Sequence, residues 1–263
     1  PAAGSTAALS DPRRIDLRGP LPSGAEEALA RELPRLIREI RLTAGRRQGA
    51  ARRGRLWPAR MLRRSLATGG VPFAMPARAP RPRRPEVILL VDVSWSVRRA
   101  AAFFLAVARA LVSSRRKARV YLFVDRLAEA TTAVARWRGS DPRELASLLE
   151  SVPGLDPLAA SDYGRAFYQA AHARQGSVRA RRRDTVLVVL GDARSNMKEP
   201  QAWAFEDLAA RCSRVLWLDP EPAELWGTGD SVLHAYLPSC DVVCEARDLD
   251  GIARGIAEIV RSL

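Results

Sequence analysis

Residues 87–96 are Val-Ile-Leu-Leu-Val-Asp-Val-Ser-Trp-Ser, and this stretch decides the fold class. An unbroken apolar run of this kind is typical of a strand buried on both faces, which occurs in parallel sheets covered by helices. Further apolar runs lie at 120–124, 185–190, 214–218 and 241–244, and helical patterns lie between and after them at 98–114, 142–150, 162–174, 200–211 and 248–262. We therefore expect an α/β fold with a doubly wound, mainly parallel sheet flanked by helices, of the Rossmann type.

Asp92, Ser94 and Ser96 stand at alternating positions where the first strand ends. Because ligands bind at the carboxyl ends of the strands in such sheets, these side chains bring three oxygen atoms to a favoured place for a site. A carboxylate with hydroxyls, without thiol or imidazole, suits Mg²⁺, Ca²⁺ or Mn²⁺ rather than zinc. Each residue taken alone has a structural alternative, since Ser and Asp before a helix are most often N-caps.

The spacing of these residues resembles the Asp-x-Ser-x-Ser signature of von Willebrand factor A domains. The metal-ion-dependent adhesion site of that family completes the shell of the cation from two later loops. On this resemblance, Ser161 takes the place of the family's Thr or Ser hydroxyl, and Asp192 takes the place of its second acidic residue. Trp95 and Val97 stand where the family usually has glycine and methionine, which implies a stiffer loop. The metal ligands that the resemblance implies are Asp92, Ser94, Ser96, Ser161 and Asp192, with Mg²⁺ as the cofactor and Ca²⁺ or Mn²⁺ as alternatives.

The C-terminal third looks like the CoxE-like branch of these domains. The stretches that carry this second resemblance are 214–222, 226–231, 238–241 and 245–249, with Gly69, Gly70 and the arginine-rich lead-in upstream. CoxE-like proteins work beside MoxR-type AAA+ ATPases in maturing or remodelling metalloenzymes and other complexes. The resemblance therefore implies a metal-ion-dependent protein-binding module that is not an enzyme. It also implies three partners: a protein that offers an Asp or Glu carboxylate, a MoxR-type ATPase and a client protein.

The positive charge is concentrated in the N-terminal part of the chain. Residues 1–86 hold 19 arginines and 7 acidic residues, a net charge of +12, out of +14 for the whole chain. We expect residues 1–86 to form an arginine-rich N-terminal extension, helical in part from Ser23 onward, and residues 87–263 to form the von Willebrand factor A-like domain. An arginine-rich arm also suits nucleic acid, since arginines neutralise phosphates. Only Trp57 and Phe73 offer aromatic rings among these arginines, so protein contact ranks ahead of nucleic acid.

Several other classes find little support in the sequence. The chain has no Gly-x-x-x-x-Gly-Lys-Ser/Thr phosphate loop and no Gly-x-Ser-x-Gly nucleophile elbow. A metal-dependent hydrolase ranks last, because no convincing general base accompanies the predicted site. The three cysteines lack paired spacing, which favours reduced thiols in a cytoplasmic protein. No apolar stretch is long enough to span a bilayer, so we expect no membrane partner.

Overall fold

The computed structural model describes residues 11–18, 85–114, 117–137, 142–172, 178 and 184–262, together with residues 31, 35, 38, 55–56, 65–66 and 77–78. The chain divides into two compact units, one made of residues 1–44 and 85–263 and the other of residues 45–84. In the second unit, the short strands β1 (Arg55–Leu56) and β2 (Ala77–Arg78) pair in antiparallel fashion.

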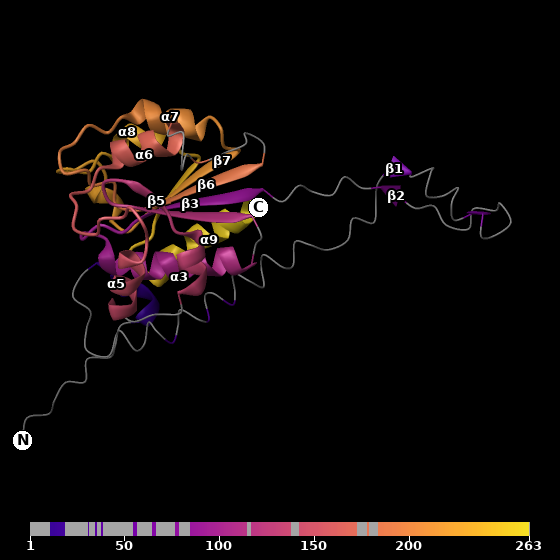
Figure 1. The fold of residues 1–263 in the computed structure, drawn as a ribbon, viewed down its shortest axis with the longest axis horizontal. Coiled ribbons are helices and arrows are strands. Elements are labelled where there is room, and N and C mark those ends of the chain that lie inside the picture. Colours follow the sequence, from indigo (N-terminus) through magenta and orange to yellow (C-terminus); the bar gives the residue numbers. More distant parts are fainter. Residues whose placement is uncertain are drawn as a thin grey trace, which may run out of the picture. The chain divides into compact units, whose positions relative to one another are not determined.

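A six-stranded sheet forms the centre of the first unit (Figure 1). Its strands are β3 (Glu86–Asp92), β4 (Ala118–Phe123), β5 (Leu127–Glu129), β6 (Thr185–Leu190), β7 (Arg214–Asp219) and β8 (Val242–Glu245). They follow the order β5-β4-β3-β6-β7-β8, and all neighbours are parallel except the edge strand β5, which is antiparallel to β4. The predicted mainly parallel α/β fold is thus confirmed. The edge strand β5, only three residues long, had no signal in the sequence.

Helices cover both faces of this sheet. The α-helices are α3 (Arg98–Ser114), α4 (Thr131–Arg136), α5 (Pro142–Glu150), α6 (Tyr163–His172), α7 (Ala202–Ala209), α8 (Leu233–Tyr236) and α9 (Leu249–Arg261), and the 3₁₀ turns are η1 (Pro12–Arg14), η3 (Ala223–Leu225) and η4 (Leu237–Ser239). Figure 1 shows α6, α7 and α8 on one face of the sheet, and α3, α5 and α9 on the other. The sequence did not predict α4 and α8, which have six and four residues and therefore too few positions for a clear helical period.

The two faces have cores of different composition. Successive residues of a strand point to opposite sides, so Val87, Leu89 and Val91 of β3 pack toward α3 and α9, whereas Ile88 and Leu90 pack toward α6 and α7. The first core is mainly aliphatic. The second contains a group of buried rings, namely Tyr121, Phe123, Tyr163, Phe167, Phe205, Trp217 and Tyr236. This aromatic core lies behind the candidate site described below.

Residues 11–18 precede the expected domain boundary at residue 87, yet they contribute to the core of the sheet domain. The Leu17 side chain is fully buried, and its backbone N–H donates a hydrogen bond of 2.8 Å to the Arg247 carbonyl. Arg13 forms an ion pair with Asp250 at the start of α9, with 2.9 Å between Nε and Oδ1. This segment therefore belongs structurally to the sheet domain.

The other expectations for the N-terminal extension fall mostly outside the described residues. Positions 31, 35 and 38 of the predicted N-terminal helix are helical and exposed. The rest of that helix and nearly all of the arginine-rich arm lie outside the described residues. Their predicted contacts with protein or nucleic acid stay predictions.

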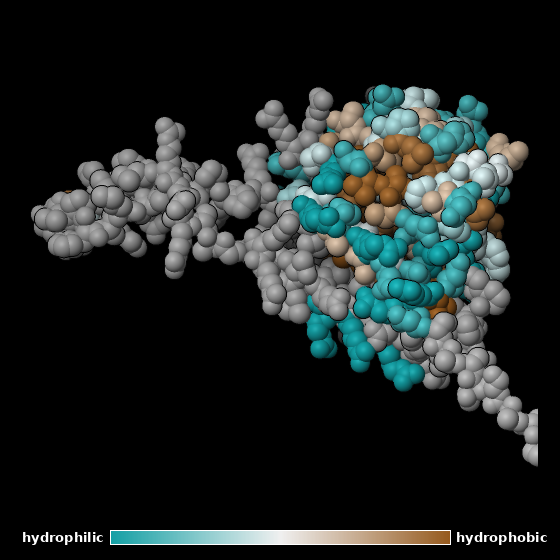
Figure 2. All heavy atoms as spheres, turned by 180° about the vertical axis from the view of Figure 1, so that it is seen from behind, coloured by the Kyte–Doolittle hydropathy of each residue, from teal (hydrophilic) through white to brown (hydrophobic). Residues whose placement is uncertain are grey.

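All three cysteines are free and partly buried, and burial raises the pKa of Cys212 and Cys240 to about 12. These two thiols therefore stay protonated near neutral pH. Within the described part of the chain, no helix is both long and apolar enough to cross a membrane. The described part of the face shown in Figure 2 is mainly hydrophilic, and its largest group of hydrophobic residues lies in the upper part of the view.

Candidate metal centre

The carboxyl ends of β3, β4 and β6 meet where the order of the strands reverses. The chain passes from β3 to β4 on one side of the sheet and returns later to β6 on the other side. A reversal of this kind leaves a crevice at the carboxyl ends, which is where such sheets bind ligands. Asp92 is the last residue of β3, and Asp192 follows the end of β6. The Asp162 N–H donates to the Val124 carbonyl at 2.9 Å, which holds the loop containing Ser161 at the end of β4.

Asp92 is fully buried and both of its carboxylate oxygens accept hydrogen bonds. The Ser94 backbone N–H donates to Oδ1 at 2.8 Å, and the Tyr163 hydroxyl donates to Oδ2 at 2.6 Å. The Ser94 and Ser96 hydroxyls lie 3.2 Å apart. Ser94 is buried whereas Ser96 is exposed, so this pair of hydroxyls runs from the interior toward solvent.

Asp192 is also buried, and it links the end of β6 to the loop after β3. Its Oδ1 accepts the Arg194 N–H at 3.0 Å, and the Ser96 hydroxyl forms a hydrogen bond with its carboxylate. Ser161 is buried and reaches the same edge through its loop: the Asn196 side chain donates to the Ser161 carbonyl at 3.3 Å. The five residues predicted from the sequence thus lie at one edge of the sheet, Asp92 at the end of β3 and the other four on three loops.

Three residues that the sequence did not single out shape the back of this site. A Cβ atom on Gly191 would lie 2.2 Å from the Tyr163 hydroxyl and 2.7 Å from the Asp92 Cβ, so any larger residue would have to displace one of these side chains. The Trp217 indole N–H donates to the Gly191 carbonyl at 2.8 Å, and its ring stacks on Tyr163 at 5.9 Å. No signal in the sequence marked these three residues, because a glycine after a strand and aromatic residues with apolar neighbours are ordinary patterns.

The electrostatics of the site favour a cation. Burial raises the pKa of Asp92, and the nearby Asp192 carboxylate raises it further. Burial also raises the pKa of Asp192, against hydrogen bonds from the Arg194 N–H and the Ser96 hydroxyl that lower it. The Glu221 carboxylate adds to the rise, and the Arg194 guanidinium opposes it. Among the described residues, no Lys or Arg forms an ion pair with either carboxylate. Two carboxylates and several hydroxyls form an all-oxygen donor set, which fits a hard divalent ion whose charge would offset theirs.

The described part of the chain contains no group of three or more His, Cys, Asp or Glu side chains placed to hold a metal. The predicted site differs from such a group, because only two of its five residues are acidic and the other three are serines.

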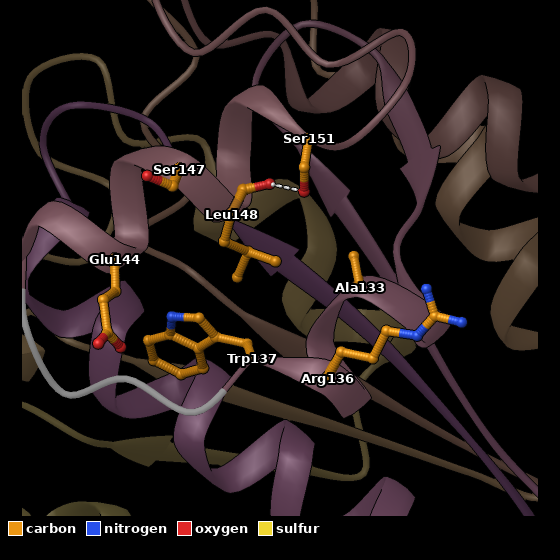
Figure 3. Close-up of a pocket in the computed structure, with 7 residues that line it drawn as sticks. All are labelled: Ala133, Arg136, Trp137, Glu144, Ser147, Leu148 and Ser151. Carbon is orange, nitrogen blue, oxygen red and sulfur yellow. Dashed lines mark hydrogen bonds between the residues drawn. The ribbon is translucent and has the colours of Figure 1, made fainter.

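A shallow groove of about 450 Å³ lies between α4 and α5. It is lined by Ala133, Arg136, Trp137, Glu144, Ser147, Leu148 and Ser151 (Figure 3). The buried indole nitrogen of Trp137 has no hydrogen-bond partner among the described residues. None of the five predicted site residues lines this groove.

Comparison with known proteins assigns the family. The family model described as "VWA domain containing CoxE-like protein" matches residues 28–252. No curated protein sequence matches the chain.

Similar solved structures include a von Willebrand factor type A protein from Catenulispora acidiphila, with 14% identity and a TM-score of 0.42, over 67% of this chain and 42% of that one. Proximal thread matrix protein 1 from the mussel byssus has 13% identity and a TM-score of 0.43, over 67% of this chain and 47% of that one. The RO (RSR) protein of Deinococcus radiodurans has 18% identity and a TM-score of 0.38, over 89% of this chain and 45% of that one. The chain thus spans less than half of the length of each of these proteins.

The family match covers most of the chain, including all five predicted site residues and the strands that carry them. The observed sheet, with helices on both faces and an acidic residue at the end of β3 and just after β6, agrees with that assignment. The chain belongs to the family of VWA domain containing CoxE-like proteins and is, in general terms, a protein-interaction module.

Proposed function

We propose that this chain is a metal-ion-dependent protein-binding module that acts as an adaptor for a MoxR-type AAA+ ATPase. The observation that carries the proposal is the pair of buried carboxylates, Asp92 and Asp192, which face serine hydroxyls and form no ion pair with a Lys or Arg among the described residues. A buried charge without a counter-charge is unfavourable, so a site built this way fits an ion from solution.

The side chains of the site have separable roles in this proposal. Asp92, Ser94, Ser96, Ser161 and Asp192 would hold Mg²⁺, with Ca²⁺ or Mn²⁺ as alternatives. When bound, the ion supplies a positive charge and an exchangeable position for an Asp or Glu carboxylate of a partner. Tyr163 orients the Asp92 carboxylate through its 2.6 Å hydrogen bond, and the exposed Ser96 stands on the solvent side, where a partner arrives.

Membership of the family, rather than the site alone, supports the proposed adaptor role. The module binds a client or the ATPase itself, the partner hydrolyses ATP, and the assembly remodels or matures a metalloenzyme or another complex. Binding, not turnover, is the proposed activity of this chain. The partly buried free thiols suit a cytoplasmic setting, in which thiols are kept reduced.

Ion binding is tested first with the metal alone. Isothermal titration of the protein with MgCl₂ should give a saturable signal that Asp92→Asn removes. A matched control is Asp207→Asn, which changes an exposed carboxylate on α7 that pairs with His172 at 3.3 Å. Equal ion binding by all three proteins would place the ion elsewhere and contradict the proposal.

Partner binding is tested by affinity capture from the lysate of the source cell, with Mg²⁺ or with EDTA, for the same three proteins. We expect an AAA+ ATPase or a metalloenzyme to be recovered only with Mg²⁺ and an intact Asp92. Recovery of the same proteins in EDTA would contradict metal dependence. Recovery of nucleic acid that is independent of the ion and sensitive to salt would favour the alternative function of the basic arm.

A further inference from the structure

The loops of the candidate metal centre expose large apolar side chains. Among the described residues, the exposed large hydrophobic side chains are Leu66, Trp95, Leu158, Tyr168, Met197, Trp203 and Leu237. The three that are most exposed within the sheet domain are Leu158 at 87%, Met197 at 84% and Trp95 at 76%. Trp95 stands between Ser94 and Ser96, Leu158 shortly before Ser161, and Met197 shortly after Asp192. Each of the three site loops therefore presents one of them, and we call these three residues the apolar rim.

Hydrogen bonds fasten the loops of Leu158 and Met197 to each other. Asn196, directly before Met197, donates to the Ser161 carbonyl at 3.3 Å. Lys198, directly after Met197, donates from Nζ to the Ala160 carbonyl at 3.1 Å. The residues on both sides of Met197 are thus hydrogen-bonded to the loop that carries Leu158 and Ser161, and these bonds hold Met197 in place.

The backbone holds Met197 outward in a conformation that is unfavourable for its residue type. Its φ of 59° lies in the left-handed region, as do the φ angles of Ala193 at 55° and Asn196 at 49°. Such conformations in residues other than glycine persist only where the surroundings enforce them, and they gather at binding sites. Burial of the Met197 side chain does not offset this unfavourable backbone conformation, because the side chain is almost wholly in solvent.

Trp95 is held in place as well. The Arg98 guanidinium lies over its indole ring, 4.9 Å from the ring centroid. An ordered, exposed tryptophan loses little conformational entropy when a partner covers it, which makes it a favourable anchor. Single exposed apolar residues are normal on protein surfaces. Here three stand on the three loops of one site, and two of them are held by specific contacts or backbone geometry, which favours a role in contact with a partner.

We propose that the apolar rim selects the residues beside the partner's carboxylate, so that the partner offers an Asp or Glu flanked by apolar side chains on an exposed loop. This inference rests on the proposed metal-dependent function. Charge complementarity identifies the central residue, since the proposed divalent ion would offer an exchangeable position to a carboxylate. Lys198 adds a positive charge next to the Ser161 loop, where its Nζ donates to the Ala160 carbonyl. A cation alone distinguishes poorly among the many carboxylates on protein surfaces. Burial of the apolar rim against apolar neighbours of one carboxylate supplies the discrimination.

The test is an array of short peptides probed with the labelled full chain, in Mg²⁺ and in EDTA. The peptides carry a central Asp, Glu or Asn, flanked either by Leu, Val and Phe or by Ser and Gln. We expect the wild type to bind peptides that combine a central acid with apolar flanks at least about tenfold better than acidic peptides with polar flanks, and only in Mg²⁺. The Asn peptides report adhesion that needs no carboxylate.

A rim variant separates this inference from the function on which it rests. Trp95→Ser, Leu158→Ser and Met197→Asn are combined, with Asn at 197 because it tolerates a positive φ. This variant should keep Mg²⁺-dependent binding of acidic peptides and lose the preference for apolar flanks. Trp203→Ser with Tyr168→Ser removes exposed aromatic rings that belong to α7 and α6 and not to the three site loops, and it should leave the preference unchanged.

The outcomes are distinct. Mg²⁺-dependent binding of acidic peptides regardless of their flanks would overturn the rim inference and leave the proposed function intact. The same result follows if the preference persists in the rim variant. Absence of any Mg²⁺-dependent binding of acidic peptides would overturn the proposed function, and the rim inference with it. Near-identical thermal unfolding midpoints show that the rim variant is folded, as expected when only exposed side chains change.

Discussion

At the carboxyl ends of the strands, one group of acidic side chains is bound by arginines and a neighbouring group is not. Glu221 is buried, and Arg194 donates to both of its carboxylate oxygens at 2.9 Å, while Arg18 donates at 2.5 Å. Arg194 also donates to Asp230 at 2.6 Å. Asp92 and Asp192, equally buried, have only hydroxyl and backbone donors around them.

The difference shows how this domain treats buried charge. Where acids are structural, as at Glu221, the chain supplies guanidinium groups that satisfy them, one of them from a residue 203 positions away in the sequence. At Asp92 and Asp192 it supplies hydrogen-bond donors and no ion pair among the described residues, and the Arg194 charge only partly opposes the rise in the pKa of Asp192. Since an unpaired buried charge is costly, the second arrangement fits a cation that comes from outside the chain. Removing a charge should therefore have opposite effects in the two groups.

At a single pH, the largest effect of a substitution is expected for Arg194→Ala. The substitution leaves the buried Glu221 with Arg18 alone and Asp230 without its 2.6 Å partner. We expect a loss of about 3 kcal/mol in the free energy of unfolding, measured by urea denaturation in EDTA. Arg247→Ala is the matched control, because it breaks a partly exposed pair with Glu245 and should cost less than about 1 kcal/mol. Equal losses in the two variants would remove the distinction between the groups.

Gly191→Ala tests the close packing behind the unpaired acids. The added methyl group must displace the Tyr163 hydroxyl or the Asp92 side chain, and we expect a loss of about 2 kcal/mol in the free energy of unfolding. In a Tyr163→Phe background the hydroxyl that the methyl group meets is absent, so the same substitution should cost clearly less. Simple additivity of the two changes would show that the contact with Tyr163 is not the cause.

Asp219 is influenced by acids of both groups, and its raised pKa should make the free energy of unfolding depend on pH. One of its oxygens accepts the Glu221 N–H at 2.7 Å, and Oδ2 has no partner among the described residues. Burial raises the pKa of Asp219 to about 8, and the Asp192 and Glu221 carboxylates add to this against Arg18. The folded state thus holds a proton that the unfolded state releases near its ordinary pKa of about 4.

The stability that Asp219 contributes is therefore fully present below about pH 4 and is lost as the pH rises toward 8, by up to about 1.4 kcal/mol per pH unit. We expect the free energy of unfolding of the wild type to fall more steeply between pH 5 and pH 8 than that of Asp219→Asn. Urea denaturation at several pH values measures both slopes. Parallel slopes would mean that Asp219 is ionised throughout this range.

The sequence predicted the long elements of the fold well, for a physical reason. The helix expected at 98–114 is observed with the same bounds, because seventeen residues offer enough turns for its apolar pattern to stand out. The runs buried on both faces, such as 185–190, were equally clear. The strand β5 and the helix α4 were missed, since each is too short to show a period and is fixed by its contacts with β4.

For the candidate site, the sequence pointed to residues that stand next to predicted strands and helices. It did not point to Tyr163 and Gly191, whose roles depend on contacts with residues far away in the sequence. Asp92 and Asp192 follow apolar runs, which made them visible. Tyr163 contacts Asp92 across 71 positions, and Gly191 matters only because that contact leaves no room for a Cβ atom. Long-range contacts of this kind leave no local pattern, and neither does the pairing of Arg18 with Glu221.

The smallest expected change in stability, for Asp92→Asn, sharpens the comparison most. In EDTA the substitution removes a buried charge that faces Asp192, and the amide oxygen still accepts the Ser94 N–H. We therefore expect the variant to be as stable as the wild type or up to about 1 kcal/mol more stable, the opposite sign to Arg194→Ala.

With MgCl₂ at ten times the dissociation constant measured by titration, the wild type should gain about 1.4 kcal/mol by mass action, and the variant should gain nothing. Urea denaturation with and without the ion measures both differences. A large loss of stability in EDTA would mean that Asp92, like Glu221, is a structural acid whose charge the chain itself satisfies.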